Sequence, residues 1–245
     1  GGASKVMRAL PWIGLAALAV APLVGIGNYP LHMLIQVLLW GFVYTGWSIM
    51  GRLGMVSFGH GAFLGIGAYV VVMCWNHYGL TPWIGLPIAL ALTAVVAFLI
   101  GYPCFRFKIV GHYFALVTLA LSEITRLLIV AMRDQTGGSL GVTPKTALTD
   151  SSYSLVALQF SNKLVWFYIV LLVWLAGLWV WKKVDRSMGR LALEAISQEE
   201  DAAASIGINV TRLKLGVTLI SALMTCVGGA LEAMQRRKPV SASAQ

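Results

Sequence analysis

Long apolar runs separated by short polar gaps limit the fold of this chain more than any other feature. Seven runs have the length of a membrane span: residues 10–27, 31–50, 56–76, 83–102, 113–132, 164–181 and 213–234. A helix needs about 20 apolar residues to cross about 30 Å of hydrocarbon. Hydrophobic residues make up 58% of the chain and charged residues 11%, a composition that soluble domains do not approach. The pattern predicts an all-α fold, a polytopic transmembrane helical bundle of about seven spans.

Lys and Arg are distributed unevenly over the polar gaps. If the N-terminus is cytoplasmic, the cytoplasmic gaps hold Lys5, Arg8, Arg52, Arg106, Lys108, Lys182, Lys183, Arg186, Arg190, Arg212 and Lys214. The opposite side, up to the last span, holds only Arg133, Lys145 and Lys163. This bias follows the positive-inside rule and predicts a cytoplasmic N-terminus. It also accounts for the net charge of +9 without a nucleic-acid partner.

Two polar segments interrupt what we interpret as a single transmembrane domain, residues 1–245. Residues 133–162 are rich in Thr, Ser, Gly and Pro and predict an extracytoplasmic loop. Residues 182–209 are charged and favour helix. Ser197 and Glu200 form a capping-box pattern, so one short helix should end near Ile196 and another begin at Gln198, with Gly207 as its C-cap. The pair is either a docking element or an ordinary solvated connection.

The glycine-rich stretch GMVSFGHGAFLGIGAYV, residues 54–70, is not a nucleotide loop. It lacks the third glycine of GxGxxG, and the chain has no GxxxxGK[ST] motif, so any ATP-driven activity needs a separate subunit. On a helix, Ser57, Gly61 and Gly65 form a stripe of small residues that allows close helix packing. A broken helix beside a polar path, with His60 as its polar side chain, is the other interpretation.

Ionisable residues inside a span are costly and face protein or water. Glu123 and Arg126 can pair on one helix face, either for packing or for translocation, and Thr118 and Ser122 are placed to hydrogen-bond to them. No catalytic motif is present, and the Cys and His residues are dispersed without metal-ligand spacing. These features predict a protein that is not an enzyme and holds no metal.

Four motifs, in the same order over residues 52–229, resemble those of the permease subunits of branched-chain amino acid ABC importers. They are GMVSFGHGAFLGIGAY, YFALVTLALSEITRL, TGGSLGV and GRLALEAISQEEDAAASIGINVTRLKL. The chain looks more like the M-type permease of the heterodimer than like its H-type partner. Family members continue with further apolar segments, so the resemblance implies an importer permease fold truncated at its C-terminus.

The resemblance also implies roles for individual residues. In the family's EAAxxxG coupling element, which contacts the ATPase, Asp201 replaces Glu. The expected ATPase-coupling residues within 182–209 are Arg190, Glu194, Glu199, Glu200, Asp201, Ala202, Ala203 and Gly207. Those expected at the translocation path or in helix packing are Ser57, His60, Gly61, Phe63, Gly65, Thr118, Ser122, Glu123 and Arg126. Docking of a binding protein is expected at Thr136, Gly137, Gly138 and Ser139.

By this resemblance the chain is a permease subunit in a bacterial or archaeal cytoplasmic membrane. Its expected partners are a homologous permease, two cytoplasmic ATPases that carry ATP and Mg, a periplasmic or extracellular substrate-binding protein, and the lipid bilayer. It has no cofactor of its own. Leucine, isoleucine and valine are the leading solutes; urea, amides and aromatic acids are alternatives. A secondary transporter driven by an ion gradient and a membrane scaffold without transport are the rival classes.

Overall fold

The computed structural model describes residues 2–25, 27–109, 111–138, 153–154, 159–160, 163–186 and 189–236. Its elements, in chain order, are α1 (Gly2–Val20), η1 (Ala21–Val24), α2 (Asn28–Gly51), α3 (His60–Tyr78), α4 (Pro82–Arg106), α5 (His112–Ala131), α6 (Arg133–Thr136), β1 (Tyr153–Ser154), β2 (Gln159–Phe160), α7 (Lys163–Arg186), α8 (Gly189–Gln198), α9 (Glu200–Ser205) and α10 (Val210–Gln235). The two short strands pair antiparallel. All other elements of the described part are helices, so the predicted all-α class is confirmed.

Six helices of the described part are long and apolar enough to cross a membrane. They cover Ser4–Val24, Tyr29–Gly51, Pro82–Arg106, His112–Ala131, Lys163–Arg186 and Val210–Gln235. Each corresponds to one of the seven predicted spans. The remaining prediction, residues 56–76, corresponds to α3, which has 19 residues and begins only at His60. The polytopic bundle is therefore present, and its third span is shorter than the apolar run suggested.

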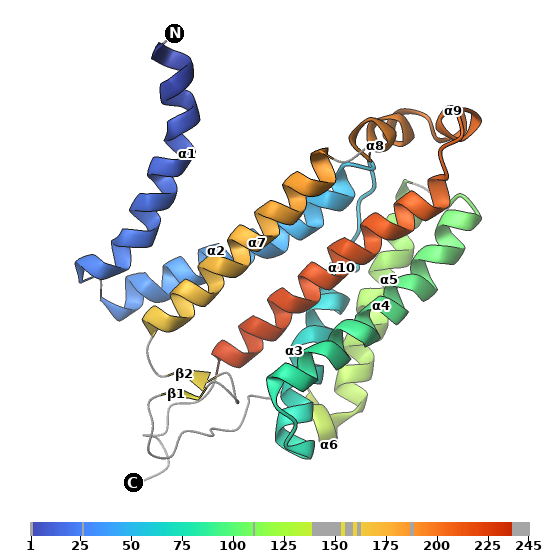
Figure 1. Cartoon of the computed structure of the whole chain (residues 1–245). Coiled ribbons are helices and arrows are strands. Elements are labelled where there is room, and N and C mark those ends of the chain that lie inside the picture. The colour runs from blue at the N-terminus through green and yellow to red at the C-terminus, as the bar shows by residue number, and fades with distance from the viewer. Residues whose placement is uncertain are drawn as a thin grey trace.

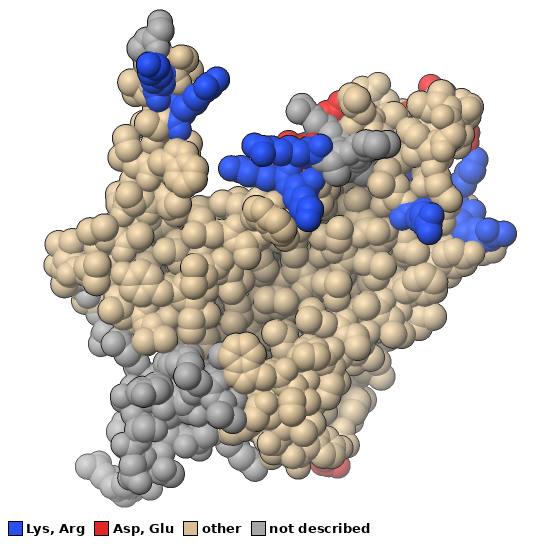
Figure 2. Space-filling model, viewed as in Figure 1, with Lys and Arg blue, Asp and Glu red and all other residues tan. Residues whose placement is uncertain are grey.

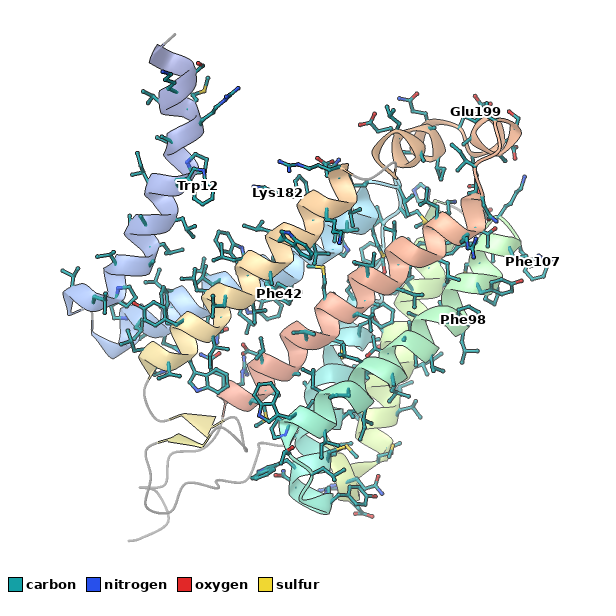
Figure 3. All side chains as sticks on the ribbon, in the orientation of Figure 1. Trp12, Phe42, Phe98, Phe107, Lys182 and Glu199 are labelled. Atoms are coloured by element: carbon teal, nitrogen blue, oxygen red, sulfur yellow. The ribbon has the colours of Figure 1, made fainter. Side chains whose placement is uncertain are left out.

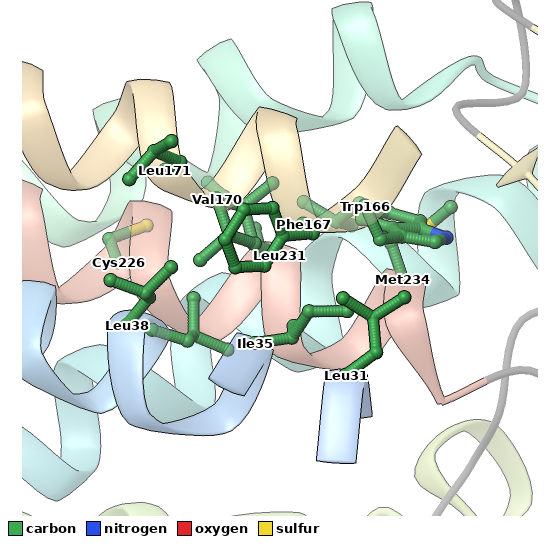
Figure 4. Packing of buried hydrophobic residues seen from close by; sticks show 14 residues of the cluster. Leu31, Ile35, Leu38, Trp166, Phe167, Val170, Leu171, Cys226, Leu231 and Met234 are labelled. Carbon is green, nitrogen blue, oxygen red and sulfur yellow. The ribbon is translucent and has the colours of Figure 1, made fainter. Parts of the chain in front are cut away.

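Helix α10 lies at the centre of the bundle (Figure 1). Within its apolar window 72% of the residues are buried, against at most 44% in any other candidate span. Helices α2 and α7 pack on one side of α10, and α3 and α4 pack on the other. Figure 4 shows the packing of α2 and α7 against α10, where Ile35 of α2, Phe167 of α7 and Met234 of α10 are fully buried. Helix α1 is peripheral, with 6% of its window buried.

The crossing of α3 and α10 depends on two glycines. A Cβ added at Gly67 would lie 2.1 Å from the carbonyl oxygen of Cys226, and one added at Gly229 would lie 2.1 Å from that of Leu64. Close approach between backbones is how helices associate in lipid, where the hydrophobic effect gives no preference. At Gly61 and Gly65 an added Cβ would make only ordinary contacts at 3.8 Å. The packing role predicted for the glycine stretch is therefore filled by Gly67.

The bundle has two distinct ends. The α8–α9 end, at the top of Figure 1, also contains the start of α1 and the C-terminal ends of α2, α4 and α7. The opposite end, which we call the α6 end, contains α6 and the two strands. Blue basic side chains gather at the α8–α9 end in Figure 2, and Lys182 and Glu199 are labelled there in Figure 3. The charge asymmetry found in the sequence is thus an asymmetry of the folded molecule.

Candidate functional site

The glycine-rich stretch begins in a non-helical connection between α2 and α3, residues 52–59, which we call the helix break. Helix α2 ends at Gly51, residues 52–59 are not helical, and α3 begins at His60. Gly54 has φ +70°, a left-handed conformation that glycine adopts without a Cβ penalty. The connection runs from the α8–α9 end back into the bundle before α3 begins (Figure 1). Helix α3 is itself continuous from His60 to Tyr78, so the interruption lies before it, and close packing applies farther along, at Gly67.

Two side chains of α5 hold the backbone of the break. The N–H of Phe58 donates to Thr118 Oγ1 at 3.0 Å, and Ser122 Oγ donates to the carbonyl oxygen of Phe58 at 2.5 Å. Non-helical backbone at membrane depth must find such partners, because hydrocarbon offers none. The sequence suggested that Thr118 and Ser122 bond to Glu123 or Arg126. That suggestion is wrong, since both hydroxyls serve the helix break.

His60 is held in a buried chain of hydroxyl groups. Its Nδ1 lies 3.1 Å from Ser57 Oγ and its Nε2 lies 2.7 Å from Ser221 Oγ of α10. Ser221 Oγ donates its own proton to the carbonyl oxygen of Gly46 at 2.6 Å, so it accepts from His60. Ser57 Oγ accepts from the N–H of Gly59 and donates to Nδ1. A neutral imidazole with its proton on Nε2 therefore satisfies every group and ties the break to α10.

An apolar groove of about 390 Å³ opens beside the break. It is lined mainly by Trp40, Tyr44 and Trp47 of α2 and by Phe58 and Gly61. Trp47 Nε1 also donates to the carbonyl oxygen of Ser57 at 3.0 Å. Sequence reasoning missed the three α2 aromatics, although their spacing of four and three residues places them on one helical face. The groove thus joins predicted residues to an aromatic wall that was not predicted.

Of the nine predicted path or packing residues, only Ser57, His60 and Gly61 line the groove. Phe63 is 4% exposed and packs with Leu121 in a buried cluster. Glu123 and Arg126 form a two-point ion pair on α5, with distances of 2.5 Å and 3.1 Å. Their side chains are 55% and 61% exposed in this chain. A pair so placed in a span requires a protein neighbour or water beside it, which agrees with either role suggested by the sequence.

The charged segment forms the two short helices that were predicted, with shifted boundaries. Helix α8 ends at Gln198 and α9 begins at Glu200, two residues beyond the expected positions. The N-cap of α9 is Glu199 without a side-chain cap, so the predicted capping box is wrong. Ser197 instead faces Gly54, where an added Cβ would lie 2.9 Å from Ser197 Oγ. The C-cap of α9 is Ile206, one residue before the predicted Gly207, which follows it with φ +92°.

Both acidic residues at the start of α9 have basic partners within the chain. Glu200 Oε2 lies 2.6 Å from Nζ of Lys214, whose side chain is only 3% exposed. Asp201 Oδ1 lies 2.5 Å from Nζ of Lys108. The hydrogen bond and then the charge of Lys108 lower the pKa of Asp201, and the same pair raises the pKa of Lys108. Ala203 is buried at 1%, so Glu200 and Ala203 hold α9 against the bundle, while Asp201 makes an exposed ion pair with Lys108, just after α4.

The other predicted coupling residues differ in exposure. Glu194, Glu199 and Ala202 are exposed at the α8–α9 end. Arg190 belongs to α8, but its side chain lies outside the described part. Two large apolar side chains that the sequence did not single out are exposed there as well: Leu191 at 79% and Ile206 at 75%. No local pattern marked them, because in a chain this apolar an exposed Leu or Ile looks like any other.

At the α6 end, the predicted docking residues close a turn. Thr136 is 3% exposed; its Oγ1 donates to the carbonyl oxygen of Met132 at 3.0 Å and accepts from the N–H of Gly138 at 3.2 Å. Gly137 and Gly138 have φ +75° and +58°. Ser139 lies outside the described residues. Thr136 therefore shapes this turn and offers little surface to a partner.

The polytopic helical bundle, the non-helical connection that returns into it and the charged two-helix segment at one end agree with the transport permease that the four motifs suggested. The family described as the permease component of the branched-chain amino acid transport system matches residues 29–244. The chain belongs to this family. The match confirms the resemblance drawn from the four motifs, and the family that it names is a transport permease component and not an enzyme family.

Two curated relatives carry the same printed name, high-affinity branched-chain amino acid transport system permease protein LivM. The protein from Salmonella typhimurium strain LT2 is 32% identical over 206 residues, and the protein from Escherichia coli K12 is 33% identical over 206 residues. Each alignment covers 77% of this chain and 48% of the relative. The chain thus spans about half the length of the curated relatives it matches. No solved structure matches it significantly.

Proposed function

We propose that the chain is the membrane-spanning permease subunit of an ATP-driven uptake system for leucine, isoleucine and valine. The single observation that carries this proposal is the family match over residues 29–244, which includes the helix break and the α8–α9 segment. The chain would act in a bacterial or archaeal cytoplasmic membrane. It would work with a homologous permease, two ATPases that supply ATP and Mg, and a substrate-binding protein.

The charge distribution supports a cytoplasmic α8–α9 end. Lys5, Arg8, Lys182 and Lys183 belong to elements that meet there (Figures 1 and 2). Basic residues concentrate on the cytoplasmic side of membrane proteins. The N-terminus would then be cytoplasmic, and residues 182–209 would face the ATPases. Residues 133–162, which include Ser139 and the turn at Thr136, Gly137 and Gly138, would face the binding protein.

We assign the ATPase-docking surface to the exposed face of α8 and α9. Leu191 and Ile206 would supply its apolar contacts, while Glu194, Glu199 and Ala202 would surround them. Glu200 and Asp201 contribute indirectly, because their carboxylates are bonded to Lys214 and Lys108 of the same chain. Ala203 and Gly207 would also act indirectly. Ala203 buries one side of α9, and Gly207 turns the chain toward α10.

The solute path would run beside the helix break. Ser57 and His60 would shape its wall without binding solute, because both ring nitrogens of His60 are already bonded. Gly61 would border the path directly, and the Glu123–Arg126 pair would lie against the second permease or the path itself. A proton-driven transporter would need a titrating carboxylate in this region, but Glu123 is bonded to Arg126 through both oxygens. The geometry favours the ATP-driven proposal.

The double variant Leu191→Asp, Ile206→Asp should lose the ATPases. Burial of one large aliphatic side chain contributes about 1.5–3 kcal/mol, so two carboxylates placed there should weaken association at least about tenfold. The measurement is the amount of cognate ATPase that co-purifies with the chain from detergent-solubilised membranes.

Tyr78→Asp is the matched control, because Tyr78 is 74% exposed at the C-terminal end of α3, away from α8 and α9. It should leave the recovery of ATPase unchanged. Equal recovery from both variants, or a loss confined to Tyr78→Asp, would contradict the proposed docking surface and orientation.

A further inference from the structure

The helix break is in direct contact with the α8–α9 segment. Ile196 of α8 is 5% exposed and belongs to the same buried cluster as Leu53 and Met55, which flank Gly54. An added Cβ at Gly54 would lie 2.9 Å from Ser197 Oγ and 3.6 Å from Ser197 Cβ. Gly54 also has φ +70°. The last turn of α8 is therefore seated on the start of the non-helical segment, at a position where a side chain would push it away.

The two ends of this segment are anchored to different helices. At its start, the Arg52 guanidinium pairs with Asp185 of α7 and lies 4.6 Å from the centre of the Trp181 ring. At its far end, the backbone of Phe58 is bonded to α5, and His60 is bonded to α10. Residues 53–57 lie between these anchors, and α8 is the element that touches them where they begin.

We infer that the contact between Gly54 and Ser197 transmits movement from the ATPase-docking segment to the helix break. This inference rests on the proposed function, and it assigns Gly54 and Ser197 as positioning residues for transport. A displacement of α8 by a docked ATPase reaches Gly54 directly, because no side chain or gap separates the two. From Gly54 the chain leads in three residues to Ser57, which is bonded to His60 at the wall of the groove. The contact moves as one rigid unit, and neither residue touches solute.

The substitution Gly54→Ala tests this role in the complete transporter reconstituted in proteoliposomes. The added methyl group presses on Ser197, so the leucine taken up per ATP hydrolysed should fall at least tenfold while the ATPases remain bound. Adding Ser197→Gly removes the group that is struck and should restore the ratio to within twofold of the wild type. Gly79→Ala controls for backbone strain, because Gly79 has φ +64° and no atom within 4 Å of an added Cβ.

A double cysteine variant, Gly54→Cys with Ser197→Cys, tests the contact itself. The 3.6 Å between the added Cβ and Ser197 Cβ suits a disulfide, so the cross-link should form in the purified chain. Uptake should continue with the cross-link in place, because the two residues move together. Failure to cross-link, loss of uptake on cross-linking, a double variant as impaired as Gly54→Ala, or an equal effect of Gly79→Ala would overturn the inference. If the wild-type assembly shows no ATP-driven uptake at all, the proposed function is refuted. A cross-link that still forms in the double cysteine variant would then establish the contact alone.

Discussion

Replacing Gly67 or Gly229 by alanine should destabilise the bundle by at least about 3 kcal/mol, the upper part of the usual range for overpacking. A methyl group at either position would overlap a backbone carbonyl of the other helix, at 2.1 Å from Cys226 O or Leu64 O. A side chain can move aside, but a helical backbone can do so only if the helices separate. Because α10 is the central helix, separation there exposes much of the core.

The measurement is unfolding of the detergent-purified protein, followed by the reaction of its thiols with a maleimide dye. Cys104 and Cys226 are buried at 4% and 0% exposure, so they react when the bundle opens. Gly216→Ala is the control within α10, because an added Cβ at Gly216 meets nothing within 4 Å. The free energy of unfolding of that variant should stay within about 0.5 kcal/mol of the wild-type value. Equal stability of Gly67→Ala and Gly216→Ala would contradict the packing described for α3 and α10.

Lys214→Met should detach α9 from the bundle. The Lys214 side chain is 3% exposed and that of Glu200 is 20% exposed, so the substitution leaves a partly buried carboxylate without its partner. Breaking such a pair costs about 3–5 kcal/mol, whereas replacing both members by apolar residues is often neutral. The double variant Lys214→Met, Glu200→Leu should therefore recover most of the loss.

Hydrogen exchange of the α9 amides reports this local stability. The comparison variant is Lys108→Met, which removes an exposed pair whose side chains are 65% and 79% exposed. Exposed pairs contribute at most about 1 kcal/mol, so exchange in α9 should change little. If Lys108→Met accelerated exchange of the α9 amides as much as Lys214→Met does, burial of the Lys214–Glu200 pair would not be the reason for its contribution to the stability of α9.

The candidate spans and the two short helices of the charged segment were predictable because their signals are local. Apolar length identified the six helices that are long and apolar enough to cross a membrane, and the EDAAAS stretch identified α9. The helix break could not be decided from the sequence, because glycine spacing fits both packing and a broken helix. What decides it is that Thr118 and Ser122, some sixty residues away, hold the backbone of Phe58.

The same limit applies to individual residues. The sequence pointed to Gly61 and Gly65 for packing, but the neighbour that requires a glycine at position 67 is the backbone of Cys226, on a helix at the other end of the chain. The ion pairs of Glu200 and Asp201 could not be foreseen from the local motif, because their basic partners, Lys214 and Lys108, belong to other elements. Ser197 matched a capping-box pattern with Glu200. Its contact with Gly54 could not be foreseen, because Gly54 is distant in sequence.

Uptake of radiolabelled leucine into proteoliposomes tests the central claim most directly. The vesicles would contain the chain, its companion permease, the cognate ATPases and the binding protein. We predict uptake that requires ATP hydrolysis, stops when the ATPases are inhibited by vanadate, and persists when a protonophore collapses the proton gradient. Uptake by the chain alone, driven by a proton gradient and independent of ATP, would contradict the account.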